Sequence, residues 1–216
     1  MTVRTPISRL GIALFFAVFA AYAVADERAD GRAGGRAEVP AAIDASATQD
    51  AALDRMTAHL LRMLPMDRIF SQVMGEHREE LEKQLDSKKF ACLQDEISAD
   101  AFRSRKRADV LRFAIAKPQA FESGLNVLND GAAAMIVNIM EASLSGKEYD
   151  IGSADPDSMV AFMSFAYASE HADLRELSGF GDFNKPNASG AALEAMMNSL
   201  AVDISEHCSI PPEFFK

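Results

Sequence analysis

The sequence predicts an all-α fold: a single-domain bundle of about seven helices after a signal peptide and a flexible leader. The first observation is that apolar residues recur at three- and four-residue spacing through most of residues 48–216, as on one face of a helix. The second is that no segment shows the strict alternation of apolar and polar residues that is typical of a half-buried strand. A domain of this length can bury a substantial hydrophobic core.

Residues 1–25 have the three parts of a secretory signal peptide. A basic start with Arg4 and Arg9 precedes an apolar stretch, and Ala23-Val24-Ala25 offers the small side chains that a signal peptidase accepts. The apolar run over 10–25 is shorter than the roughly 20 residues of an ordinary membrane span, although an uncleaved anchor is the alternative. We therefore expect a periplasmic or secreted protein without a stable membrane span after cleavage.

The composition narrows the class of partner. Residues 26–47 are rich in Ala, Gly, Arg and Asp and hold almost no bulky side chain, which predicts a flexible leader before the helical domain over 48–216. The chain carries 22 Lys and Arg against 32 Asp and Glu, a formal net charge of −10. An acidic protein is repelled by nucleic acid and by anionic membrane surfaces. We therefore expect no nucleic-acid partner.

The first two predicted helices are separated by a proline. Thr48 is placed to cap a helix over residues 49–64, and Pro65 ends or kinks it. Residues 66–88 form the clearest amphipathic pattern in the chain, with an apolar stripe opposite a face of glutamates and a lysine. This pattern predicts one continuous helix.

The middle of the domain is divided by caps and turn residues. Residues 90–97 predict a short helix, and Ser98 then caps a helix that ends before Pro118. A helix over 121–128 is followed by Asn129-Asp130-Gly131, a turn signal that predicts a break in the chain.

The last three helices have clear start or stop signals. Residues 134–144 form an apolar helix that Gly146 closes. Asp155-Pro156 is a good helix start, and the pattern continues to residue 167. Apolar residues from 192 to 204 predict a terminal helix that delivers His207 and Cys208 and cannot continue past Pro211-Pro212.

The two cysteines, Cys92 and Cys208, are expected to form a disulfide. An exported chain enters an oxidising compartment, where an even number of cysteines usually pairs. The bond would close a long loop, which stabilises the fold by about 4 to 5 kcal/mol in the chain-entropy model. His207 beside Cys208 could suggest zinc, but zinc needs further ligands that no spacing in the sequence supplies. We therefore expect no metal and no cofactor.

No motif indicates a catalytic residue. The Glu-x-x-His pairs of di-iron bundles, the His-Glu-x-x-His of zinc proteases and the Gly-x-Ser-x-Gly of many hydrolases are absent from the sequence. His77 precedes Glu80 by three residues on the predicted helix over 66–88. This pair is the basis of the alternative prediction, a hydrolase whose His/Glu site the sequence does not reveal.

The remaining candidates are contact surfaces. A basic cluster on one predicted helix could bind an anionic group, although it could equally be the solvated face of that helix. Aromatic residues exposed in a loop and in the tail often mark interfaces. The basic residues are Arg103, Arg105, Lys106, Arg107 and Arg112, and the aromatic residues are Phe180, Phe183, Phe214 and Phe215.

The 11 methionines lie mostly singly on the apolar stripes of separate helices, which favours core packing over a Cu(I) site. A methionine-lined groove for a peptide or a lipid is the alternative. Because a good helical core stands beside no catalytic signature, we expect a non-enzymatic helical module. Its predicted partner is a protein, peptide or lipid of the cell envelope.

Overall fold

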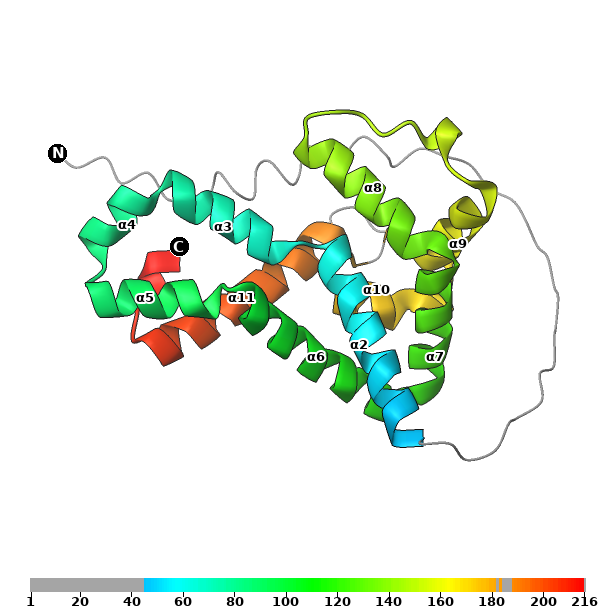
Figure 1. The fold of residues 1–216 in the computed structure, drawn as a ribbon, viewed down its shortest axis with the longest axis horizontal. Helices are drawn as coiled ribbons and strands as arrows, with labels where there is room; N and C mark the ends of the chain where they lie inside the picture. Colours follow the sequence, from blue (N-terminus) through cyan, green and yellow to red (C-terminus); the bar gives the residue numbers. More distant parts are fainter. Residues whose placement is uncertain (1–44, 182, 184–187, 216) are drawn as a thin grey trace.

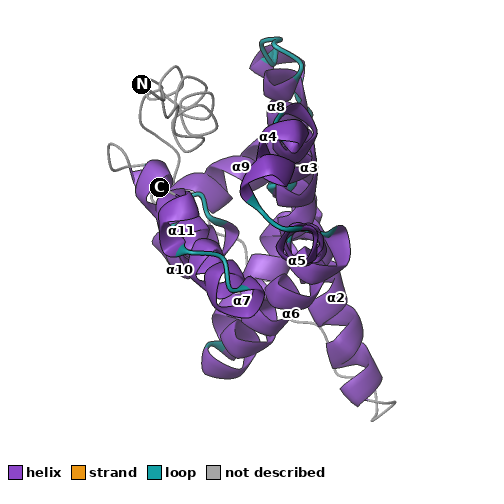
Figure 2. Cartoon of the chain, turned by 90° about the vertical axis from the view of Figure 1, so that its left-hand side faces the viewer, coloured by secondary structure: helices purple, strands orange, loops and turns teal. Residues whose placement is uncertain are grey.

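The computed structural model describes residues 45–181, 183 and 188–215, and it is all-α over these residues (Figure 1). Figure 2 shows helices joined by loops, with no strand among the described residues. The predicted fold class, an all-α single domain, is therefore confirmed. The predicted signal peptide over 1–25 and nearly all of the predicted leader lie outside the described residues.

The helices follow one another with short connections. In chain order they are α2 (Ala45–Met63), α3 (Met66–Glu76), α4 (Arg78–Gln84), α5 (Ser87–Glu96), α6 (Ala99–Ala116), α7 (Pro118–Val127), α8 (Ala133–Leu144), α9 (Pro156–Tyr167), α10 (Ala172–Ser178) and α11 (Ala188–Cys208). Shorter turns are η1 (Leu128–Ala132), η2 (Ile151–Ser153), η3 (Ser169–His171) and η4 (Pro212–Phe215).

The single helix predicted over 66–88 is wrong, because the chain breaks twice there. α3 ends at Glu76, and α4 ends before Leu85, whose backbone is extended. The Asp86 carboxylate then accepts a hydrogen bond of 2.9 Å from the Lys89 amide and so caps α5. Because the Asp86 side chain caps a new helix, the backbone does not continue α4 through this position.

Other start and stop signals are confirmed, with one exception. Ser98 caps α6 and Asp155 caps α9, each by accepting a hydrogen bond from a backbone amide three residues later. Thr48 does not cap the first helix, because α2 begins at Ala45 and includes it. The alanines around Thr48 have high helix propensity and carry the helix past it.

The turn predicted at Asn129-Asp130-Gly131 is present as a bend inside a helical segment and not as a break. The π turn η1 joins α7 directly to α8, and only Gly131 leaves the helical region, with φ of 123°. α9 packs against this bend. A Cβ atom on Gly131 would lie 2.8 Å from the Cα of Ser158, so the absence of a side chain permits the contact.

Two hydrophobic clusters form the interior. The main cluster draws on α2, α6, α7, η1, α8, α9 and α10, and a second cluster lies between α4, α5 and the end of α11. Phe70 of α3 and Phe102 of α6 pack against both clusters, with ring centroids 5.8 Å apart. The core-packing prediction is confirmed for the buried methionines Met56, Met63, Met66, Met135 and Met140.

α11 packs against both clusters, and its course can be followed in Figure 1. Its first half contributes Leu193, Met196 and Met197, which are partly buried against the main cluster. Its second half contributes Leu200 and Ile204 to the second cluster and lies beside α5. A cleft lies beside α11, with residues of both halves of the helix in its lining.

Replacing Gly131 by alanine tests the close approach of η1 to α9. We expect Gly131→Ala to lower the free energy of unfolding by about 2 to 3 kcal/mol, because it adds both backbone strain and a steric clash. Gly146→Ala is the matched control, since Gly146 also has positive φ, 66°, but no atom lies within 4 Å of its added Cβ. Its loss should be about 1 kcal/mol. Equal losses in urea denaturation of the two variants would contradict the packing argument.

Candidate functional site

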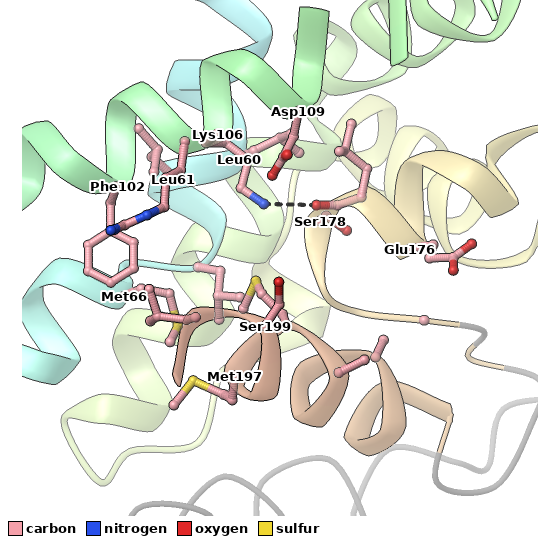
Figure 3. A pocket seen from close by; sticks show the side chains of 18 of the residues that line it. Leu60, Leu61, Met66, Phe102, Lys106, Asp109, Glu176, Ser178, Met197 and Ser199 are labelled. Carbon is pink, nitrogen blue, oxygen red and sulfur yellow. Dashed lines mark hydrogen bonds between the residues drawn. The ribbon is translucent and has the colours of Figure 1, made fainter. Parts of the chain in front are cut away.

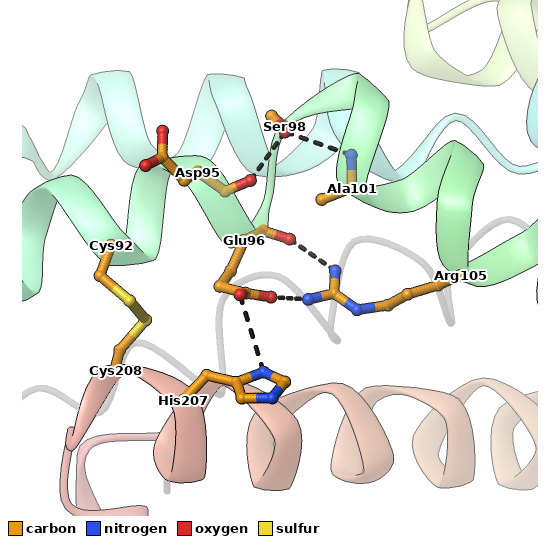
Figure 4. A network of polar contacts seen from close by, with 8 residues as sticks. All are labelled: Cys92, Asp95, Glu96, Ser98, Ala101, Arg105, His207 and Cys208. Carbon is orange, nitrogen blue, oxygen red and sulfur yellow. Dashed lines mark hydrogen bonds and ion pairs between the residues drawn. A yellow bond between two sulfur atoms is a disulfide. The ribbon is translucent and has the colours of Figure 1, made fainter.

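The structure brings Cys92 and Cys208 to disulfide distance, as predicted (Figure 4). Their Cα atoms are 5.6 Å apart, and the bond closes a loop of 116 residues. Cys208 is 5% exposed within the second cluster. The described residues include no free cysteine. The bond therefore ties the end of α11 to α5.

A polar network beside the disulfide joins α5, α6 and α11 (Figure 4). The Glu96 carboxylate forms an ion pair with Arg105, and Arg105 also donates a hydrogen bond of 2.6 Å to the Glu96 carbonyl oxygen. His207 Nδ1 lies 3.7 Å from the same carboxylate. His207 and Arg105 thus contact Glu96, and this network reinforces the covalent link.

The predicted basic cluster is spread around α6, and most of its members have acidic partners. Arg107 donates hydrogen bonds to Asp54, at 2.7 Å, and to Asp50, at 3.1 Å, both on α2. The hydrogen bond to Asp54 and the charge of Asp54 raise the pKa of Arg107 above its usual value. Arg112 forms an ion pair with Asp109 within α6. An anionic partner for these arginines stays a prediction.

Arg103 is exposed and lines a small cleft of about 300 Å³ at the junction of α2, α3, α6 and α8. Its lining combines three arginines, Arg62, Arg68 and Arg103, with two acidic residues, Asp67 and Glu141. Binding of an anion at Arg103 stays a prediction.

The aromatic residues of the loop and tail are not exposed, which corrects the sequence expectation. Phe180 is 3% exposed, and its ring stacks on Phe183 at 6.2 Å and meets Phe165 edge-on at 6.3 Å. Phe214 and Phe215 are partly buried against the second cluster. The physical reason is that the loop and the tail fold back onto the helices. Burying their large aromatic surface stabilises the folded state more than leaving it exposed to water.

The predicted pair His77 and Glu80 does not form a recognisable site. His77 is half-buried at the junction of α3 and α4, while Glu80 is exposed and accepts a hydrogen bond of 3.3 Å from Gln84. Neither residue lines the small cleft at Arg103 or the larger cleft beside α11. Among the residues that the structure describes, no three His, Cys, Asp or Glu side chains gather as a metal site would require.

The main cleft lies between α11 on one side and α2, α6 and α10 on the other (Figure 3). We call it the α11 cleft; its volume is about 910 Å³. Its apolar lining includes Leu60, Leu61, Leu64, Met66, Met196 and Met197. Small residues from α11, among them Ala191, Ala192 and Ala195, line the same wall as the methionines.

Lys106 is the most unusual polar residue of the α11 cleft. Its Nζ donates a hydrogen bond of 3.0 Å to the carbonyl oxygen of Leu177, in the last turn of α10 (Figure 3). Burial lowers the pKa of Lys106, and the charge of Asp109 opposes this only in part. The sequence placed Lys106 in the basic cluster but gave no sign that its surroundings differ from those of its neighbours.

A buried polar corner joins α9 to α10. Arg175, which is 3% exposed, donates hydrogen bonds to the carbonyl oxygens of Phe165, at 2.7 Å, and Ala168, at 2.9 Å, at the end of α9. His171 is 2% exposed, with Nε2 3.4 Å from Glu170. Burial lowers the pKa of His171; the charge of Glu170 opposes the shift and the charge of Arg175 adds to it.

Sequence reasoning missed this corner. The one local signal for a buried His171 is its place one turn before the apolar Leu174.

No helix among the described residues combines the length and the hydrophobicity that a membrane span requires. The apolar run over 10–25 lies outside the described residues.

Removing the disulfide tests how much it stabilises the fold. We expect the double variant Cys92→Ala, Cys208→Ala to lose about 4 kcal/mol of unfolding free energy, because its unfolded chain regains the loop entropy. Reductant should destabilise the wild type and leave the double variant unchanged in the same urea titration. Two alkylatable thiols in wild-type protein purified without reductant would contradict the link.

His171 should make the fold sensitive to mild acid. Its folded pKa is lowered, so the unfolded chain binds the proton first, and stability falls as pH drops below about 6.5. His171→Gln should remove this part of the fall between pH 7.5 and 5.5, measured as unfolding free energy at each pH. The exposed His207→Gln is the control and should retain it. An unchanged slope in His171→Gln would show that other groups cause the acid response.

Comparison with known proteins supplies no relative: no family model, no curated protein and no solved structure matches this chain.

Proposed function

We propose that this chain is an exported, non-enzymatic helical module of the cell envelope that binds the hydrocarbon portion of a lipid in the α11 cleft. Export is supported by the signal-like residues 1–25 and by the Cys92–Cys208 pair, because disulfides persist mainly in oxidising compartments. On this proposal the protein is periplasmic or secreted. Of the protein, peptide and lipid partners that the sequence predicts, the proposal selects the lipid.

The α11 cleft is the observation that carries the proposal. Its volume of about 910 Å³ lies in the range of small-molecule sites, and its lining combines leucine, methionine and alanine side chains with charged residues from α6, α10 and α11. Leucines from the end of α2 face methionines from α11 across the cleft. Methionine side chains are flexible and polarisable, so this lining can adapt to a chain of variable shape.

A hydrocarbon chain suits this cleft better than an extended peptide does. The walls are helices, whose backbone amides and carbonyls are already hydrogen-bonded to one another except at the helix ends. An extended peptide would bury its own backbone polar groups against such walls without partners, at a cost in free energy. A hydrocarbon chain has no polar groups to satisfy and gains from burial alone.

The proposal is tested by filling the cleft. Ala195→Phe places a phenyl ring in the lining of the cleft, whereas Asn198→Phe places it on an exposed position of α11 outside that lining. The neutral fluorescent probe N-phenyl-1-naphthylamine should brighten with wild type and with Asn198→Phe. Ala195→Phe should weaken binding of the probe about tenfold or more, because the ring occupies the ligand volume.

Displacement of the probe by linear 1-alkanols measures the apolar contribution. Affinity should rise about fourfold for each added methylene group from octanol to dodecanol, because burying one CH₂ is worth about 0.8 kcal/mol. No brightening with wild type, or alkanol affinities independent of length, would contradict the proposal. Displacement by an amphipathic helical peptide but not by alkanols would identify a peptide site instead.

A further inference from the structure

We propose that the lipid bound in the α11 cleft is an amphiphile with a single acidic headgroup, such as a long-chain fatty acid, and that Lys106 binds this headgroup. The inference rests on the proposed function, because it names the ligand class of the same cleft. It depends on which charged groups line the cleft and on how each of them is already engaged.

Three basic side chains line the α11 cleft, and two of them have carboxylate partners. Arg105 forms an ion pair with Glu96, and Arg112 forms one with Asp109. Lys106 differs from both, because its ammonium group donates a hydrogen bond to the neutral carbonyl oxygen of Leu177. Among the described residues that line the cleft, Lys106 is thus the cation that no carboxylate directly neutralises.

The Lys106 ammonium has donors to spare. An ammonium carries three N–H groups, and one of them is used by the Leu177 carbonyl oxygen at 3.0 Å. Burial disfavours the charged form of Lys106, as the direction of its pKa shift indicates. A carboxylate from a ligand would accept the remaining donors and restore the balance of charge, and such charge-assisted hydrogen bonds are among the strongest.

The acidic residues of the cleft limit the headgroup to one negative charge. Asp109, Glu176 and Asp203 also belong to the lining. They would repel a dianionic phosphate monoester more strongly than a carboxylate, since like charges at close range raise the energy of the charged ligand. The apolar walls bind the hydrocarbon chain of the ligand, and Lys106 binds its acidic headgroup.

Lys106 also has a structural role that the experiment must separate from ligand binding. Its bond to Leu177 satisfies a carbonyl in the last turn of α10, where helices leave carbonyl groups without internal partners. Loss of this bond would loosen the cleft for every ligand alike. Selectivity between ligands of equal chain length therefore isolates the role of the charge.

The test compares dodecanoate, 1-dodecanol and dodecyltrimethylammonium, each displacing the naphthylamine probe from four forms of the full chain. These are wild type, Lys106→Met, Lys106→Arg and the exposed surface control Lys83→Met. Wild type and Lys83→Met should prefer dodecanoate over dodecanol about tenfold, the effect of one charge-assisted hydrogen bond. Lys106→Met should abolish this preference while still binding dodecanol, and Lys106→Arg should retain it.

Each other outcome overturns either the role inferred for Lys106 or the proposed function. Equal binding of dodecanoate and dodecanol to wild type overturns the inference and leaves the proposed function standing. An equal loss for both ligands in Lys106→Met assigns Lys106 a structural role only and overturns the inference. Preference for dodecyltrimethylammonium shows that the carboxylates select the headgroup, which also overturns it. Failure of all three ligands to displace the probe from wild type means that the proposed function itself has failed.

Discussion

The attachment of α11 is the constraint on which the rest of the structure depends. Its second half is fixed to α5 by the Cys92–Cys208 link and by the second cluster. Among the described side chains of its first half, those of Leu193, Met196 and Met197 pack against the main cluster. The α11 cleft lies along this helix, from Ala191 in the first half to Asp203 in the second. The wall that α11 gives to the cleft therefore belongs to a helix whose end is fixed by the disulfide.

The polar groups of the interior serve the same architecture. Arg175 satisfies carbonyl oxygens at the end of α9, and Lys106 satisfies one at the end of α10. Both helix ends lie in crowded regions, where an unsatisfied carbonyl costs free energy. The two cations differ in surroundings: Arg175 is enclosed by the core at 3% exposure, whereas Lys106 lines the cleft. Of these two cations, Lys106 is therefore the one that can contact a ligand in the cleft.

Much of the fold was predictable because its signals are local. Apolar spacing, together with Ser98, Asp155 and Gly146, marks helices and their ends through contacts within four residues. The break after residue 84 was missed because the apolar stripe continues through it, although Asp86 was a possible cap. The cysteine link was predictable too, since two cysteines allow one pairing.

The candidate site was not predictable to the same degree, because its contacts join distant parts of the sequence. Lys106 meets Leu177 71 residues away, and nothing near Lys106 distinguishes it from the arginines beside it. Phe180 was expected at the surface because it lies in a predicted loop, yet its ring packs against Phe165. Local composition predicts that such a segment is a loop, but it does not predict which side chains of the loop are buried.

The 116-residue loop closed by Cys92 and Cys208 also determines how the molecule would respond to mechanical tension. A pulling force applied at the two ends of the chain passes through the sulfur bridge, so the segment between the bridged residues cannot lengthen. α6, α10 and nearly all of α11 belong to that shielded segment, whereas α2 precedes it. A force of this kind can therefore extend α2, α3 and α4, which precede the closed loop, while the wall that α11 gives to the cleft stays within it.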